Sequence, residues 1–216
     1  IELYFCTPMK PIWVTVGKTL KCTIIPNLFE KKHYKWVQIL LITLLQTKMS
    51  IQLTHEQTQF NSRTFPITIV SDHIYFQENI GSLFRIAEAY GVEKIILLGK
   101  NIPFIDRKIN KTSRSTHKIV PFDIIEDTET VIELLKNKET HVIALEITDD
   151  SVALNELTLP SKPLTLILGS EIYGIQNQLI ELANQKVHIN MYGTNSSMNV
   201  IQATAIMLYQ ITNLLK

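Results

Sequence analysis

The sequence predicts an α/β domain with a mainly parallel sheet flanked by helices. After Phe65, short β-rich runs alternate with segments of helical periodicity, which is the order typical of parallel sheets. Several of these runs are apolar at consecutive positions, as expected for strands that are covered on both faces. The chain has 216 residues, 45% of them hydrophobic, which is enough for one sizeable core. We therefore expect a single domain over residues 65–216.

Five runs are predicted to be the strands of this sheet. Each is short, rich in β-branched and aliphatic residues, and bounded by Gly, Pro or polar residues. In chain order they are FPITIVSD (65–72), EKIILLG (93–99), HVIALEI (141–147), PLTLILG (163–169) and VHINMY (187–192).

Four segments are predicted to be helices, at residues 79–91, 127–138, 176–184 and 198–215. In the first, apolar residues recur at helical spacing on one face: Ile80, Leu83, Phe84, Ala87 and Tyr90. The last is apolar over a wider stripe, made of Val200, Ala203, Thr204, Met207, Leu208, Ile211, Leu214 and Leu215 and widened by Ile201 and Ala205. Such a helix needs covering on more than one face.

Residues 1–48 differ from the rest of the chain in charge and in pattern. They hold seven Lys and only Glu2 and Glu30, a charge of +5, so the remainder carries −4 because the whole chain is +1. No helical or strand period is sustained there. We interpret residues 1–48 as an upstream or non-native extension before Met49, and residues 49–64 as a short leader. A basic RNA-binding arm is the alternative for residues 1–48.

Several classes of protein are disfavoured by the composition. Both cysteines, Cys6 and Cys22, precede Met49, so a disulfide framework is excluded for the main domain, and we expect an intracellular, cytoplasmic protein. The apolar run at 37–45 is too short to span a bilayer. The six histidines have no metal-ligand spacing, so no metal is expected. No G-x-G-x-x-G follows the first strand, which disfavours an ordinary dinucleotide-binding domain.

Three polar, glycine-containing segments each follow a predicted strand and open a helix. They are ENIGSLFRIAEAYG (78–91), LGSEIYGI (168–175) and NMYGTNSSMNV (190–200). In parallel sheets, ligands bind beyond the carboxyl ends of the strands, where helix N-termini present free backbone N–H groups. Taken singly, Asn79 and Asn199 are also explained as helix caps, and Glu171 by the helix dipole.

Taken together and in order, three motifs in these segments resemble those of a known family. The motifs are N-I-G-S-L-F-R (79–85), G-S-E-I-Y-G-I (169–175) and S-M-N-V-I-Q-A (197–203). They resemble the SpoU/TrmH branch of the SPOUT RNA methyltransferases, over residues 65–215. The basic segment KTSRSTHKIVPF (111–122) also stands where this family has one ahead of a strand.

The resemblance implies a fold, an assembly and a reaction. The fold is an α/β domain whose C-terminal part is threaded into a trefoil knot, and the assembly is a homodimer with the active site at or near the interface. The reaction is transfer of a methyl group from S-adenosylmethionine to a ribose 2′-oxygen of RNA. The resemblance does not separate tRNA from rRNA as the substrate.

The resemblance also implies roles for particular residues. Leu145, Gly169, Ile189, Ser197 and Met198 would line the cofactor pocket. Arg85 matches an arginine often proposed as the activating base, but a guanidinium is almost never deprotonated in proteins. Stabilising the developing 2′-oxyanion, or gripping the adjacent phosphate, is physically easier.

Polar side chains around Arg85 complete the expected site. Asn79, Glu171 and Asn199 would orient Arg85, the loops and the ribose. Arg85, Lys111, Arg114 and Lys118 would contact RNA phosphates, although a solvated loop explains the last three equally well. Two alternatives stay open: a catalytically silent RNA-binding relative, and a generic nucleotide-binding α/β enzyme.

Overall fold

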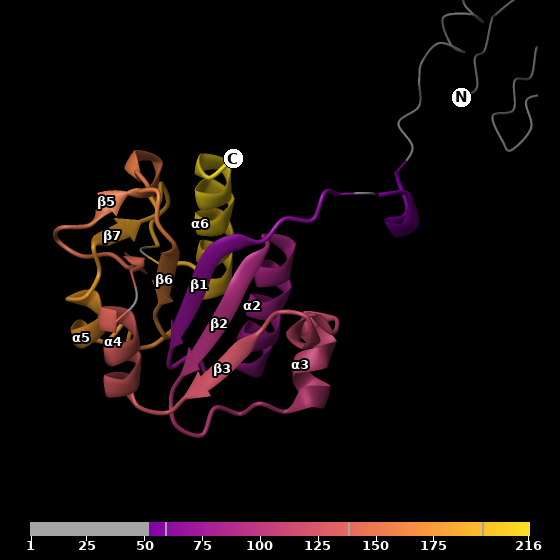
Figure 1. The fold of residues 1–216 in the computed structure, drawn as a ribbon, viewed down its shortest axis with the longest axis horizontal. Coiled ribbons are helices and arrows are strands. Elements are labelled where there is room, and N and C mark those ends of the chain that lie inside the picture. The colour runs from indigo at the N-terminus through magenta and orange to yellow at the C-terminus, as the bar shows by residue number, and fades with distance from the viewer. Residues whose placement is uncertain (1–51, 59, 138, 196) are drawn as a thin grey trace, which may run out of the picture. The chain divides into compact units, whose positions relative to one another are not determined.

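The computed structural model describes residues 52–58, 60–137, 139–195 and 197–216. Residues 60–216 form one compact unit (Figure 1). In the preceding unit, which covers residues 1–59, the one described element is a 3-10 turn, η1 (His55–Gln57). The interpretation of residues 1–48 as an extension therefore lies outside the described residues.

The sheet has seven strands, five of which were predicted, and all of them pair in parallel, in agreement with the predicted mainly parallel sheet. In chain order they are β1 (Phe65–Asp72), β2 (Val92–Leu98), β3 (Phe122–Ile125), β4 (His141–Leu145), β5 (Val152–Ala153), β6 (Leu164–Leu168) and β7 (Gln185–His188). Their spatial order is β3-β2-β1-β6-β4-β7-β5. The central strand β6 is buried at every position, which explains its unbroken apolar sequence.

Helices cover both faces of the sheet. One apolar core joins the sheet to α2 (Gln77–Ala89), α3 (Asp106–Ser113) and α6 (Val200–Leu214). The other core joins the opposite face to α4 (Thr128–Asn137) and α5 (Asn177–Ile180). Two 3-10 turns, η2 (Thr116–Lys118) and η3 (Leu154–Glu156), lie in the connections. The sequence therefore forms the three-layer arrangement expected of a parallel α/β domain.

Two predicted elements are shorter than expected. The predicted strand 187–192 begins earlier, at Gln185, and ends at His188, where its last pairings are Val187 with Leu145 of β4 and His188 with Ala153 of β5. The predicted helix 176–184 ends at Ile180. Asn184 then pairs with the backbone of Val142 in both directions, at 2.8 and 2.7 Å, so this stretch leads the chain back to the sheet.

Three elements were not among those predicted. Strand β3 begins at the end of the basic segment 111–122, where the family resemblance implies a strand, but it is not one of the five predicted runs. Helix α3 has the polar sequence DRKINKTS, with Ile109 as its buried apolar residue, so it carries no apolar stripe that periodicity could detect. Strand β5 has two residues, fewer than any alternation pattern needs. The other predicted strands and helices agree with the structure to within two residues at each end.

Candidate active site

Three neighbouring strands end side by side at the carboxyl edge of the sheet. Leu145, the last residue of β4, pairs with Leu168 at the end of β6 and with Val187 near the end of β7. The predicted cofactor residues Leu145, Gly169 and Ile189 therefore stand at or just beyond three adjacent strand ends. This is the edge at which parallel α/β sheets bind ligands.

Asn79, Glu171 and Asn199 are joined by hydrogen bonds into one chain of polar side chains, which we call the Asn–Glu–Asn cluster. The Asn79 amide nitrogen donates to a carboxylate oxygen of Glu171. The Asn199 amide nitrogen donates to the Asn79 Oδ1 at 3.2 Å. These contacts connect residues that are 92 and 120 positions apart. The three motifs that the sequence analysis singled out thus meet at one place.

Asn199 also explains why a polar residue directly precedes α6. It is the N-cap of α6, and its Oδ1 accepts from the Ile201 backbone N–H at 2.9 Å. Its amide nitrogen is left to bind Asn79. One side chain therefore caps the helix and takes part in the cluster. Just before it, Ser197 is exposed and Met198 is partly buried.

The loop that carries Glu171 is tightly folded. Ser170 and Gly174 exchange two backbone hydrogen bonds, at 3.0 and 3.1 Å. Gly174 has a φ of 67°, in the region that favours glycine. A Cβ on Gly169 would lie 2.4 Å from the Gly174 carbonyl carbon and 2.6 Å from the Ile175 nitrogen. Glycine is needed at Gly169 because two backbone segments touch there.

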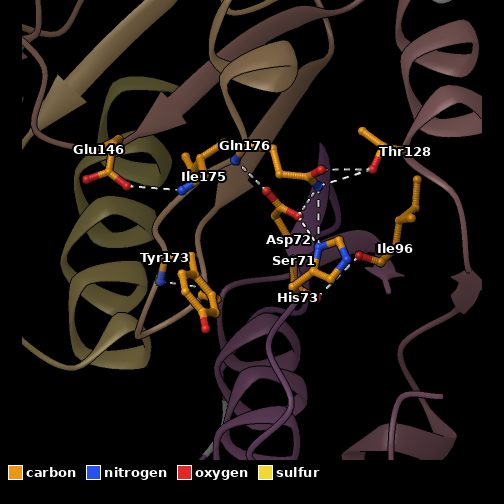
Figure 2. A network of polar contacts seen from close by, with 10 residues as sticks. Ser71, Asp72, His73, Ile96, Thr128, Glu146, Tyr173, Ile175 and Gln176 are labelled. Atoms are coloured by element: carbon orange, nitrogen blue, oxygen red, sulfur yellow. Dashed lines mark hydrogen bonds and ion pairs between the residues drawn. The ribbon is translucent and has the colours of Figure 1, made fainter. Parts of the chain in front are cut away.

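A second network, which we call the buried Asp–Gln–Thr network, holds the far end of this loop. Asp72, at the end of β1, is fully buried. Its carboxylate accepts from the Gln176 backbone N–H at 2.7 Å and from the Gln176 side-chain amide at 2.8 Å. The same amide reaches Thr128 Oγ1 at 3.1 Å, and His73 Nδ1 lies 2.5 Å from Asp72 (Figure 2). Asp72, Gln176 and Thr128 were missed by the sequence analysis.

Glu146 fixes the loop from the side of β4. Its Oε2 accepts from the Ile175 backbone N–H at 3.2 Å (Figure 2). Its Oε1 accepts from the backbone N–H of Ile147 at 2.9 Å. This carboxylate was also missed, although its place directly after a buried strand was a usable signal.

Arg85 lies on α2 but outside the Asn–Glu–Asn cluster. It is exposed, and the described part of the chain offers it no hydrogen bond or ion pair. Six residues separate it from Asn79, which on a helix means an angle of about 120° and a rise of about 9 Å. Its guanidinium therefore faces solvent from a different side of α2.

The predicted RNA-contacting residues Lys111, Arg114 and Lys118 are all exposed, at the end of α3 and in η2. Arg107 and Lys108, also exposed, extend the same segment along α3. Arg114 and Ser115 both have left-handed backbone conformations, with φ of 51° and 70°, which end the helix. Within the described part of the chain, no ion pair joins this basic segment to an acidic side chain.

Neither a metal centre nor a membrane span is found among the described residues. No group of three or more His, Cys, Asp or Glu side chains there is placed to hold a metal ion. No helix in the described ranges is both long and apolar enough to cross a bilayer.

Comparison with models of protein families shows to which family this chain belongs. The model of the SpoU rRNA Methylase family matches residues 66–209, a range that contains all three motifs. The chain belongs to the SpoU rRNA methylase family. The resemblance predicted from the motifs is therefore confirmed.

Relatives of this SpoU chain are named as enzymes that methylate RNA. It is 28% identical to the tRNA (guanosine(18)-2′-O)-methyltransferase of Aquifex aeolicus over 145 residues, which is 67% of each chain. It is 27% identical to the 23S rRNA (guanosine-2′-O-)-methyltransferase RlmB of Blochmanniella floridana, also over 67% of this chain but over 56% of that protein.

Solved structures share the fold. The A. aeolicus TrmH/SpoU tRNA modifying enzyme superposes with a TM-score of 0.63 at 25% identity, covering 70% of this chain and 76% of that one. The AdoMet-bound rRNA methyltransferase from Sinorhizobium meliloti gives a TM-score of 0.65 at 25% identity, covering 69% of this chain and 57% of that one. The chain thus spans little more than half of that enzyme.

Proposed function

We propose that this protein is an S-adenosylmethionine-dependent methyltransferase that modifies a ribose 2′-hydroxyl of tRNA or rRNA. The observation that carries the proposal is the Asn–Glu–Asn cluster, in which Asn79 of the first motif is hydrogen-bonded to Glu171 of the second and to Asn199 of the third. Membership of the SpoU family and the names of its relatives support the reaction class.

The residues proposed to hold the cofactor suit it chemically. Leu145, Ile189 and Met198 are partly buried apolar side chains that fit an adenine face. Gly169, directly after β6, allows two backbone segments to approach each other closely, because a Cβ at this position would not fit. When bound, S-adenosylmethionine supplies an electrophilic methyl group. We propose that Ser197, which is exposed, contacts the polar part of the same molecule.

The side chains of the site would then align the acceptor. Asn79 and Asn199 provide amide groups and Glu171 a carboxylate, and these are suited to holding ribose hydroxyls in one orientation. A guanidinium is almost never deprotonated in proteins, so we propose that Arg85 stabilises the developing 2′-oxyanion or binds the neighbouring phosphate. The hydroxyl proton would leave to a carboxylate or to water.

We also propose the homodimer, the trefoil knot and the cytoplasmic location that the family resemblance implies. Two features of the chain support the dimer. Ile206 and Tyr209 are 42% and 60% exposed, three residues apart on α6, so that side of an apolar helix lacks cover. Within one chain, Arg85 does not contact the Asn–Glu–Asn cluster. In a dimer, the Arg85 of the second copy would be available to that cluster.

RNA affinity would come from a local surface. The chain after residue 48 carries a charge of −4, so a general attraction to phosphate is absent there. The exposed cations of α3 and the following turn concentrate positive charge in one segment, and we propose that they bind RNA phosphates: Arg107, Lys108, Lys111, Arg114 and Lys118.

The test is methyl transfer by the full chain from radiolabelled S-adenosylmethionine to separated tRNA and rRNA pools, followed by nuclease digestion. We expect label in a 2′-O-methyl nucleotide and a loss of about 100-fold or more in Arg85→Ala. Arg85→Lys keeps the charge and should retain part of the activity. Label on a base would contradict the proposal, and RNA binding without cofactor binding would favour a catalytically silent protein.

A further inference from the structure

A hollow with an aromatic rim adjoins the Asn–Glu–Asn cluster, and the mechanism above uses none of its aromatic residues. Its volume is about 400 Å³, within the range of sites that take small ligands. It lies between the loop after β1 and the loop that carries Glu171. Glu171 is itself one of the lining residues, so the hollow is continuous with the proposed ribose site.

The rim of the hollow consists of exposed rings. Tyr75 and Phe76 come from one loop and Tyr173 from the other, and they are 40%, 55% and 87% exposed. Ile172, next to Tyr173, is 72% exposed. Exposed aromatic faces beside a nucleic-acid site are platforms on which unstacked bases rest.

His73 gives the hollow a polar group of fixed character. The Asp72 carboxylate lies 2.5 Å from His73 Nδ1. Because a carboxylate can only accept, this contact places a proton on Nδ1, and in the tautomer that has its single ring proton there Nε2 is the acceptor. The side-chain amide nitrogen of Gln176 also lies 3.3 Å from Nδ1. His73 has a left-handed backbone conformation, with φ of 56°, and its backbone N–H donates to the Leu98 carbonyl oxygen at 2.9 Å.

The ring of His73 is also oriented by its neighbours. It packs edge-on against Tyr75, with ring centroids 5.9 Å apart. Gly99 makes room for both, since a Cβ there would lie 3.0 Å from the Tyr75 hydroxyl and 3.4 Å from His73 Cδ2. The imidazole is thus positioned by a buried carboxylate on one side and an aromatic ring on another, with a third of its side chain exposed.

We propose that this hollow receives the base of the nucleotide whose ribose is methylated. The base would leave its stack, lie against Tyr173 and Phe76, and donate an N–H to His73 Nε2. This inference rests on the proposed function, because it takes the ribose site at Asn79 and Glu171 as given. It assigns Tyr173 and His73 to substrate recognition. The residues proposed for the cofactor are absent from the lining.

The test compares two synthetic RNAs that contain the methylated position, one intact and one abasic at that nucleotide. Wild type should lose activity on the abasic RNA. Tyr173→Ala should reduce kcat/KM on intact RNA by about 5- to 100-fold, the range expected for one stacked base, with no further loss on abasic RNA. Tyr173→Phe should recover most of the activity. His73→Phe should reduce kcat/KM by about 3- to 10-fold.

Controls separate this inference from the reaction itself. Phe60→Ala removes a ring that is 89% exposed and does not line the hollow. Any change in kcat/KM that this variant shows should be equal on intact and on abasic RNA. Wild-type rates on abasic RNA would overturn the inference and leave the reaction intact. Weaker S-adenosylmethionine binding by Tyr173→Ala would overturn it too, because the cofactor would then occupy the hollow.

If no RNA is methylated, the proposed reaction fails, and binding decides about the hollow. Fluorescence anisotropy with single-stranded oligonucleotides should then still show weaker binding by Tyr173→Ala than by Tyr173→Phe. Equal affinities of the two variants would remove the base site as well.

Discussion

Two polar networks at the same edge of the sheet differ in burial. The Asn–Glu–Asn cluster is open to solvent, and Glu171 and Asn199 are both exposed. The Asp–Gln–Thr network lies centrally around Asp72, which has no exposed surface. The two networks hold opposite ends of one short loop, from Glu171 to Gln176.

The difference indicates that the two networks have separate roles. A buried carboxylate that accepts two hydrogen bonds from Gln176 would be costly to leave unpaired, so the inner network fixes the shape of the loop. Exposed hydrogen bonds add little to stability, so the outer cluster is free to exchange its partners for a substrate. Changes in the first network should therefore alter stability, and changes in the second should alter activity.

The strongest test of the inner network is Asp72→Ala. The substitution leaves the Gln176 backbone N–H, the Gln176 side-chain amide and the His73 ring without the carboxylate that they contact. We therefore expect the free energy of unfolding to fall by roughly 3 kcal/mol. Denaturant unfolding measures this. Asp72→Asn keeps an acceptor for the Gln176 N–H and should lose less. An unchanged midpoint in Asp72→Ala would refute the division between the networks.

Gly169→Ala tests the close approach inside the loop. The new Cβ would stand 2.4 Å from the Gly174 carbonyl carbon, so backbone must move, at a cost of about 1–3 kcal/mol. We expect a lower melting temperature and S-adenosylmethionine binding weaker by about 10-fold, measured by calorimetry. Gly193→Ala is the matched control, because nothing lies within 4 Å of its added Cβ. Equal effects of the two substitutions would contradict this reading.

The smallest effect is expected at Asp127, which caps α4 outside both networks. Hydrogen bonds from the Thr130 side chain and backbone lower the pKa of Asp127. A carboxyl whose pKa is lower in the folded state stabilises the protein above its unfolded pKa, and this contribution disappears as pH falls through the folded pKa.

Asp127→Ala should therefore lower the melting temperature by a few degrees at neutral pH. The difference from wild type should shrink as the solution is acidified, as thermal scans across pH will show. A difference that stays constant into the acid range would mean that the charge of Asp127 contributes nothing.

The sequence was most informative where polar side chains of the site come soon after a predicted strand. Asn79, Glu171 and Asn199 were predicted as site residues from the family resemblance of three motifs. Each motif lies in a segment that follows a strand, and parallel strands bring such segments to one edge. The inner network could not be found this way. Gln176 lies 104 residues from Asp72 and 48 from Thr128, and nothing local in the sequence marks those pairs.

The same limit applies to the elements that were missed or shortened. Periodicity records burial, so α3, which buries little besides Ile109 and Ser113, left no signal. The end of β7 coincides with its last pairings with β4 and β5, and a strand's own sequence does not specify where its partners end. Sequence patterns thus predicted which faces are covered, while pairing partners and element ends depended on the tertiary structure.

The most direct test of the central claim is a double-mutant cycle within the Asn–Glu–Asn cluster. Asn199→Ser keeps a cap for α6 but is too short to reach Asn79, and Glu171→Ala removes the carboxylate. Methyl transfer to the RNA 2′-hydroxyl is measured for both single variants and for the pair. If the three residues act as one unit, the double variant should lose no more activity than the weaker single variant. Losses that multiply independently would contradict the account.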